Sequence, residues 1–149
     1  MTTTDAITAL NELIEINNDR IEGYKTAIKE TTDSNLRATF LELTATSEKN
    51  LSELIEAVYN LGGKPEEGTK TSGKIYRIWM DARAALTGGD RHQILSSCEY
   101  GEDVALSAYE HVLEHHTEEL SPAHLQLVRS QKARVQQDHD KIKAMRDAE

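Results

Sequence analysis

The placement of glycine and proline constrains this chain more than any other feature of its sequence. Six of its eight glycines fall between positions 62 and 89, and only two prolines, Pro65 and Pro122, occur in 149 residues. Because both residue types interrupt helices, the long segments on either side of this zone are free to be helical. Those segments are rich in residues that favour helix, and none alternates apolar and polar residues as a strand does. The sequence therefore predicts an all-α protein.

Apolar residues spaced three and four positions apart predict four long amphipathic helices. The expected ranges are 5–30, 35–61, 90–116 and 122–147, with a short extra helix over 72–86 inside the connection 62–89. Residues suited to helix ends flank these ranges, namely Asp33 or Ser34, Gly62-Gly63, Asp90 and Ser121-Pro122.

The lengths of the connections predict the topology. The connection between the second and third helices is long enough to cross the bundle, so the third helix can run parallel to the second. The other two connections are short. One long crossover is typical of ferritin-like four-helix bundles. We therefore expect one ferritin-like domain over residues 1–149.

The charge balance and the hydropathy exclude several partners. With 17 Lys and Arg against 26 Asp and Glu, the net charge is −9, which does not fit a nucleic-acid binder that neutralises phosphates. No apolar run approaches the roughly 20 residues that span a bilayer, and the N-terminus lacks the features of a signal peptide. The single cysteine excludes an internal disulfide and suits a reducing compartment. We expect a cytoplasmic protein without membrane insertion.

Polar residues interrupt the expected inward faces of the four helices. Such groups can satisfy one another by hydrogen bonds and fix the register of the helices. The residues of this expected polar core layer are Asn17, Ser47, Glu102 and Asp138, with Tyr24 and Tyr109 capping it.

A di-metal site is the alternative interpretation of the same layer. Ferritin-like sites place a glutamate on two helices and a Glu-x-x-His pair on each of the other two. The chain supplies Glu102, but Asn17 stands at the corresponding place on the first helix, and the fourth helix offers Gln136-x-x-His139. No histidine has an acidic residue three positions before it. We favour a metal-free layer over a degenerate site at Glu102 and His139 that holds iron or another divalent metal.

Histidine, cysteine and tryptophan are the other residue types that could carry chemistry or binding in this chain. His111 and His115 could chelate a divalent ion, but their face carries no third converging ligand in the sequence, so a solvated face is favoured. Cys98 falls on the inward stripe of the third helix, which predicts a buried, inert thiol. Trp79, on the crossover helix, either seals the side of the bundle or anchors an interface.

Three sequence blocks carry a resemblance to a known family. They are residues 13–24 (LIEINNDRIEGY), residues 79–81 and 84–90 (WMD and AALTGGD), and residues 98–103 (CEYGED). Together they resemble a bacterial domain-of-unknown-function family of four-helix-bundle proteins in the ferritin-like superfamily. The resemblance implies that fold, a bacterial source, and a role in stress or envelope adaptation, but no assigned activity. Superfamily membership suggests iron chemistry, and only Glu102 and His139 match the expected kind of ligand.

These observations favour a non-enzymatic ferritin-like bundle that acts as a stress-associated or scaffolding protein and self-associates through the crossover helix. One alternative is an iron-handling protein or oxidase with a reduced site around Glu102 and His139. A second alternative is a helical adaptor that binds a partner protein through Trp79.

Overall fold

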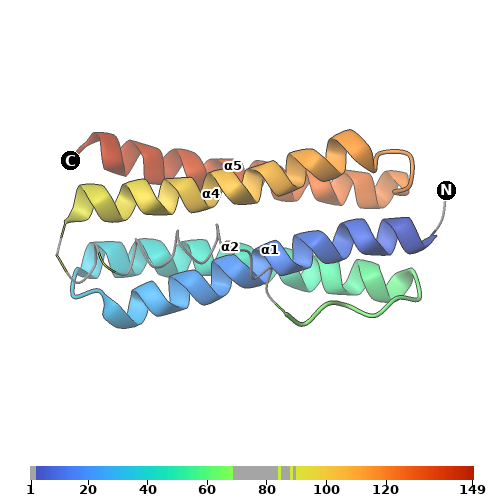
Figure 1. Ribbon diagram of the computed structural model, residues 1–149, viewed down its shortest axis with the longest axis horizontal. Helices are drawn as coiled ribbons and strands as arrows, with labels where there is room; N and C mark the ends of the chain where they lie inside the picture. Colours follow the sequence, from blue (N-terminus) through green and yellow to red (C-terminus); the bar gives the residue numbers. More distant parts are fainter. Residues whose placement is uncertain (1–2, 69–83, 85–87, 89) are drawn as a thin grey trace.

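Four long helices make up most of the described chain. The computed structural model describes residues 3–68, 84, 88 and 90–149, and within them lie α1 (Thr3–Glu30), α2 (Ser34–Asn60), α4 (Arg91–His115) and α5 (Pro122–Asp147) (Figure 1). These residues contain no strand, which confirms the all-α prediction. The expected helix at 72–86 falls almost wholly outside the described residues, and Trp79 lies outside them too.

Capping side chains, each from the residue just before a helix, fix where α2 and α4 begin. The Asp33 carboxylate accepts hydrogen bonds from the backbone N–H groups of Asn35 and Leu36, at 2.9 and 3.1 Å. Asp90 caps α4 through the N–H of Gln93, at 3.1 Å. Each bond satisfies a backbone N–H that has no partner within its helix. The capping residues therefore allow the start of each of these helices to be predicted from the sequence.

Two glycines end α2. Gly62 has φ = +79°, the left-handed conformation in which a side chain is strained. A Cβ at Gly63 would lie 2.7 Å from Cδ1 of Ile7, so the chain can pass α1 this closely only without a side chain. The following residues, 64–68, are held along α1 because Asn11 and Asn18 hydrogen-bond their backbone.

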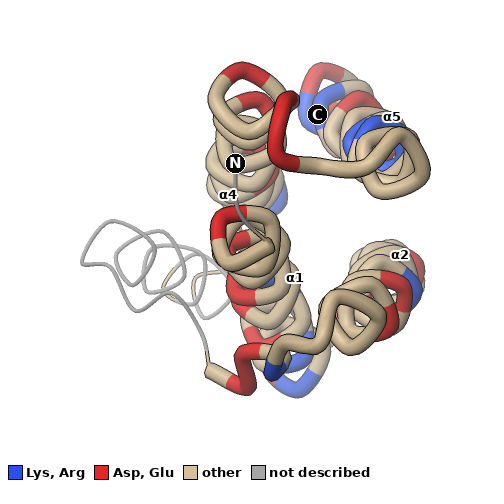
Figure 2. The backbone as a smooth tube through the Cα atoms, turned by 90° about the vertical axis from the view of Figure 1, so that its right-hand side faces the viewer, with Lys and Arg blue, Asp and Glu red and all other residues tan. Residues whose placement is uncertain are grey.

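The helices form two antiparallel hairpins packed side by side. α1 and α2 make one hairpin, and α4 and α5 make the other. Across the interface α1 contacts α4 and α2 contacts α5, which places the four helices at the corners of a bundle seen end-on (Figure 2). α2 and α4 run in the same direction along the bundle (Figure 1). No helix in the described part of the chain is both long and apolar enough to cross a membrane.

Two apolar clusters fill the core, one toward each end of the bundle. The first includes Leu10, Leu54, Tyr109 and Val128, and the second includes Tyr24, Phe40, Leu95 and Ile142. Between them, each helix contributes a polar side chain to the interior. The buried polar side chains therefore lie in the middle of the bundle, between the two apolar clusters.

Candidate functional site

A buried arginine lies at the centre of the bundle. Arg20 on α1 is 2% exposed, and Glu102 on α4 is fully buried opposite it. The guanidinium donates from Nε to Glu102 Oε2 at 2.8 Å and from Nη2 to Oε1 at 2.6 Å. This two-bond geometry matches the planar fork of arginine to the two carboxylate oxygens, and both oxygens of Glu102 are engaged by it.

The other two helices complete the coordination of the arginine. Nη1 of Arg20 donates to Oγ of Ser47 on α2 at 2.6 Å, and Nη2 also donates to Oδ2 of Asp138 on α5 at 3.2 Å. Each of the four helices thus contributes one residue to this group. We call Arg20, Ser47, Glu102 and Asp138 the ionic layer.

Burial controls the electrostatics of the ionic layer. Burial alone lowers the pKa of Arg20, but the charge of Glu102 and its hydrogen bonds outweigh this, so the pKa is raised. Burial raises the pKa of Glu102 even though Arg20 opposes the shift, and it raises that of the half-buried Asp138. Burial also raises the pKa of the Tyr24 hydroxyl and of the Cys98 thiol, so this buried thiol is a poor nucleophile.

A second, uncharged group of buried side chains lies next to the ionic layer. Asn17 donates to the hydroxyl of Tyr109 at 2.9 Å, and that hydroxyl donates to Oε1 of Gln131 at 2.7 Å. Gln131 donates in turn to the backbone carbonyl of Asn50 at 3.0 Å. Burial raises the pKa of Tyr109 to about 12, so the phenol stays protonated. We call Asn17, Asn50, Tyr109 and Gln131 the amide layer.

A charged pair closes the amide layer on its solvent side. Arg134 donates to Oε1 of Glu53 at 2.6 Å and to Oδ1 of Asn50 at 3.0 Å. The Arg134 hydrogen bond is the main cause of a lowered Glu53 pKa, and both side chains of the pair are partly exposed.

The structure distributes the six expected core residues over two groups. Ser47, Glu102 and Asp138 are in the ionic layer, Asn17 and Tyr109 are in the amide layer, and Tyr24 lies beside Arg20. Sequence reasoning missed Arg20, Asn50 and Gln131 as members of these groups. The available signal for Arg20 was its spacing, because it follows Asn17 by three residues and precedes Tyr24 by four, on one helix face.

His139 lies in a different cluster from Glu102. Its Nε2 is 2.7 Å from Oδ1 of Asp103 and 3.8 Å from Oε1 of Glu99, and these three residues offer ligand atoms within 4.8 Å of one another. Glu99 also forms an ion pair with Arg146. We call Glu99, Asp103 and His139 the α4–α5 cluster.

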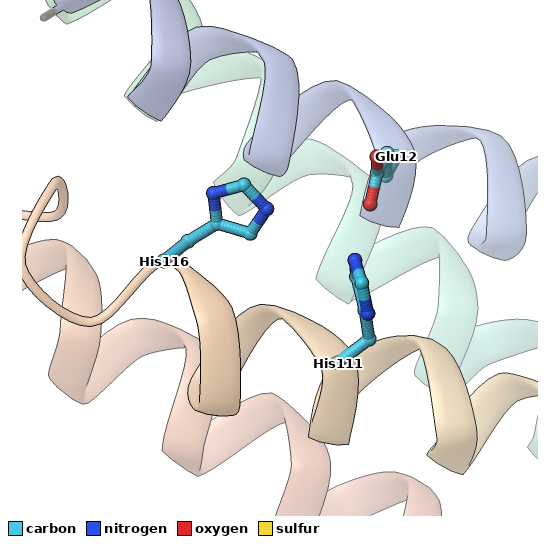
Figure 3. Close-up of side chains that lie close together, drawn as sticks. All are labelled: Glu12, His111 and His116. Carbon is cyan, nitrogen blue, oxygen red and sulfur yellow. The ribbon is translucent and has the colours of Figure 1, made fainter.

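A second set of potential ligands lies between the two hairpins. Glu12 on α1 and His111 and His116, at the end of α4, offer ligand atoms that all lie within 4.8 Å of one another (Figure 3). The ring of His115, which the sequence pairs with His111, lies tilted against that of His111 with ring centroids 4.7 Å apart. His116 is the histidine that converges with Glu12. This set therefore differs from the His111–His115 pair at two positions: His116 takes the place of His115, and Glu12 comes from another helix. We call Glu12, His111 and His116 the α1–α4 cluster.

Comparison with known proteins identifies the family. A family model described as a domain of unknown function, DUF2383, matches residues 5–115, from α1 to the end of α4. A search of curated proteins finds no match. Because the family model covers most of the chain, the protein belongs to the DUF2383 family.

Proposed function

We propose that this member of the DUF2383 family is a non-enzymatic ferritin-like bundle, stress-associated or scaffolding in role, in which an internal ion pair takes the place of a di-metal centre. One observation carries the proposal: both carboxylate oxygens of Glu102 accept hydrogen bonds from Arg20 in the middle of the bundle. The buried guanidinium supplies the positive charge that metal ions supply in di-metal bundles.

The ferritin-like topology is supported by the direction of the helices. α2 and α4 run in the same direction, so the end of α2 and the start of α4 lie at opposite ends of the bundle (Figure 1). Second and third main helices that run parallel and are joined by one long connection are typical of ferritin-like bundles.

The residues around Glu102 also support a metal-free core. Glu102 accepts from the Arg20 cation. Ser47 and Asp138 accept from the same guanidinium, and the amide layer offers neutral groups. A divalent ion on Glu102 would have to break two charge-assisted hydrogen bonds and would lie against a buried guanidinium. Both effects oppose binding strongly in a medium of low dielectric constant.

An iron oxidation assay tests this proposal. We expect Fe(II) in air to consume oxygen at the same rate with the protein as in buffer alone. We also expect the Glu102→Gln variant to bind as much iron as the parent. Oxygen consumption that requires the protein and disappears in Glu102→Gln would contradict the proposal.

A second candidate function, iron handling, is favoured by the α4–α5 cluster. One imidazole and two carboxylates are suitable ligands for Fe(II), and His139 is already in contact with Asp103. Against it, Arg146 competes for Glu99. Anaerobic Fe(II) titration of the parent and of His139→Ala decides this candidate: stoichiometric binding that the variant loses supports it, and equal binding by the two proteins excludes it.

A further inference from the structure

The α1–α4 cluster combines ligand types that the core lacks. It holds two imidazoles and one carboxylate, and it joins the first hairpin, through Glu12, to the second, through His111 and His116 (Figure 3). Two histidines and one glutamate form a recurrent ligand set of zinc sites that keep a fourth position open. The chemistry of these side chains therefore matches zinc and similar divalent transition metals.

The geometry allows the three ligands to close on one ion. Their ligand atoms lie within 4.8 Å of one another, whereas ligands bound at about 2.0–2.2 Å in a tetrahedral site are closer than this. Glu12 and His116 are half-buried and His111 is exposed, so rotation of the side chains can shorten the distances without moving the backbone.

A carboxylate already orients one of the imidazoles. Nδ1 of His116 contacts Glu119. The other ring nitrogen, Nε2, is on the side of the ring that faces Glu12 and His111 (Figure 3). Metal-binding histidines commonly use one nitrogen for the ion and donate from the other to a carboxylate, which fixes the ring orientation. Glu119 is placed to do this for His116.

The charges nearby distinguish this cluster from the α4–α5 cluster. Within residues 3–68 and 90–149, no lysine or arginine forms an ion pair with Glu12, whereas Glu99 is bound by Arg146. The α1–α4 cluster therefore leaves its carboxylate available for an external cation.

We propose that Glu12, His111 and His116 bind one divalent transition-metal ion of the zinc class, with Glu119 orienting His116. The fourth position is left to water or to another ligand. Because the ligands come from both hairpins, the bound ion links α1 to the end of α4. The proposal goes beyond the proposed function, which concerns the core, and it stands if that function is wrong.

Zinc and cobalt titrations of the chelator-treated full chain test the site. Calorimetry with Zn²⁺ should give one ion per chain, and Co²⁺ should give the visible absorption of a tetrahedral site. We expect Glu119→Gln to raise the Kd for zinc by about 10-fold. Glu12→Gln and His116→Ala each remove a ligand, so each should raise the Kd by about 100-fold or more. Circular dichroism of each metal-free variant should match that of the metal-free parent, because these side chains are partly exposed and lie outside the apolar core.

His139→Ala is the matched control, since it removes an imidazole from the rival cluster and should leave zinc affinity unchanged. The proposal is overturned if the parent shows no saturable zinc binding. It is overturned equally if His139→Ala abolishes binding while Glu12→Gln and His116→Ala retain it.

Discussion

Glu102 in the core and Glu12 at the surface both lie where the two hairpins meet, yet their surroundings differ in one respect. Glu102 is fully buried and its two oxygens are taken by Arg20. Glu12 is half-buried, faces two imidazoles and forms no ion pair with a lysine or arginine of the described residues. Within the part of the chain that the structure describes, Glu102 thus has a cationic side chain as its partner and Glu12 does not.

This difference shows how burial decides the partner of a carboxylate. A buried carboxylate must be compensated at all times, because an unpaired charge in the core costs several kcal/mol, and a side chain on a neighbouring helix is always present. At the surface, water compensates the carboxylate, so the group remains available for an ion that comes and goes.

Loss of the buried cation should have the largest effect on stability. Arg20→Met leaves Glu102 buried without its partner, so we expect the free energy of unfolding to fall by about 3–5 kcal/mol. Urea unfolding monitored by circular dichroism measures this. A loss below about 1 kcal/mol would show that the ion pair between Arg20 and Glu102 does not stabilise the fold.

The matched control replaces both members of the pair. Arg20→Met combined with Glu102→Leu removes both fully buried charges and leaves only the partly exposed Asp138 without Arg20. Apolar side chains of similar size can match a buried pair in stability. We expect the double variant to recover most of the lost free energy. If it is less stable than Arg20→Met, the damage comes from altered packing and not from an unpaired charge.

The amide layer should show a smaller effect. Gln131→Leu keeps a similar volume but removes the acceptor of the Tyr109 hydroxyl and the donor to the Asn50 carbonyl. The Tyr109 hydroxyl still accepts from Asn17, but its buried O–H loses the acceptor, which costs about 1–3 kcal/mol of unfolding free energy. Urea unfolding also measures this. An unchanged midpoint and slope would indicate that water replaces the lost partners.

The titration of Glu102 should appear as a gradual pH dependence. Its pKa is raised in the folded protein, chiefly by burial, so the folded chain holds this proton at pH values where the unfolded chain has released it. The contribution of Glu102 to the free energy of unfolding therefore falls as pH rises from about 4.3, the ordinary glutamate pKa, to its raised value in the folded protein. The slope of this contribution is at most about 1.4 kcal/mol per pH unit.

Comparing the pH profiles of the parent and Glu102→Gln isolates this contribution, because Asp138 and the surface acids titrate in both proteins. The difference in unfolding free energy between the parent and the variant should decrease through this window. A difference that stays constant with pH would contradict the raised pKa of Glu102 in the folded protein.

The smallest effect is expected at the partly exposed pair. Arg134→Ala removes the ion pair with Glu53, whose side chains are 28% and 30% exposed. Pairs in contact with solvent contribute about 0–1 kcal/mol, so the urea midpoint should move little compared with that of Arg20→Met. A loss as large as that of Arg20→Met would remove the distinction between buried and exposed charge pairs.

Much of the fold could be predicted because helix ends depend on local chemistry. Asp33, Asp90 and Gly62 act within one turn of their own position, and the expected helix ranges differ from the observed ones by no more than two residues. The inward positions of Asn17 and Glu102 likewise follow from helical spacing.

The partners of these polar residues could not be predicted in the same way. Arg20 has a long charged side chain that sequence patterns treat as solvated, and its burial depends on Glu102, 82 residues away. The convergence of Glu12 with His116 depends on how α1 packs against α4, which helical spacing within one segment does not determine.

Glu102 in the core is paired with an internal cation, and we propose that Glu12 binds an external one. Zinc content after dialysis, measured on the parent, Glu102→Gln and His116→Ala under identical conditions, distinguishes the two carboxylates. We expect one zinc ion per chain in the parent and in Glu102→Gln, and none in His116→Ala. Zinc that is lost in Glu102→Gln and retained in His116→Ala would contradict the proposal.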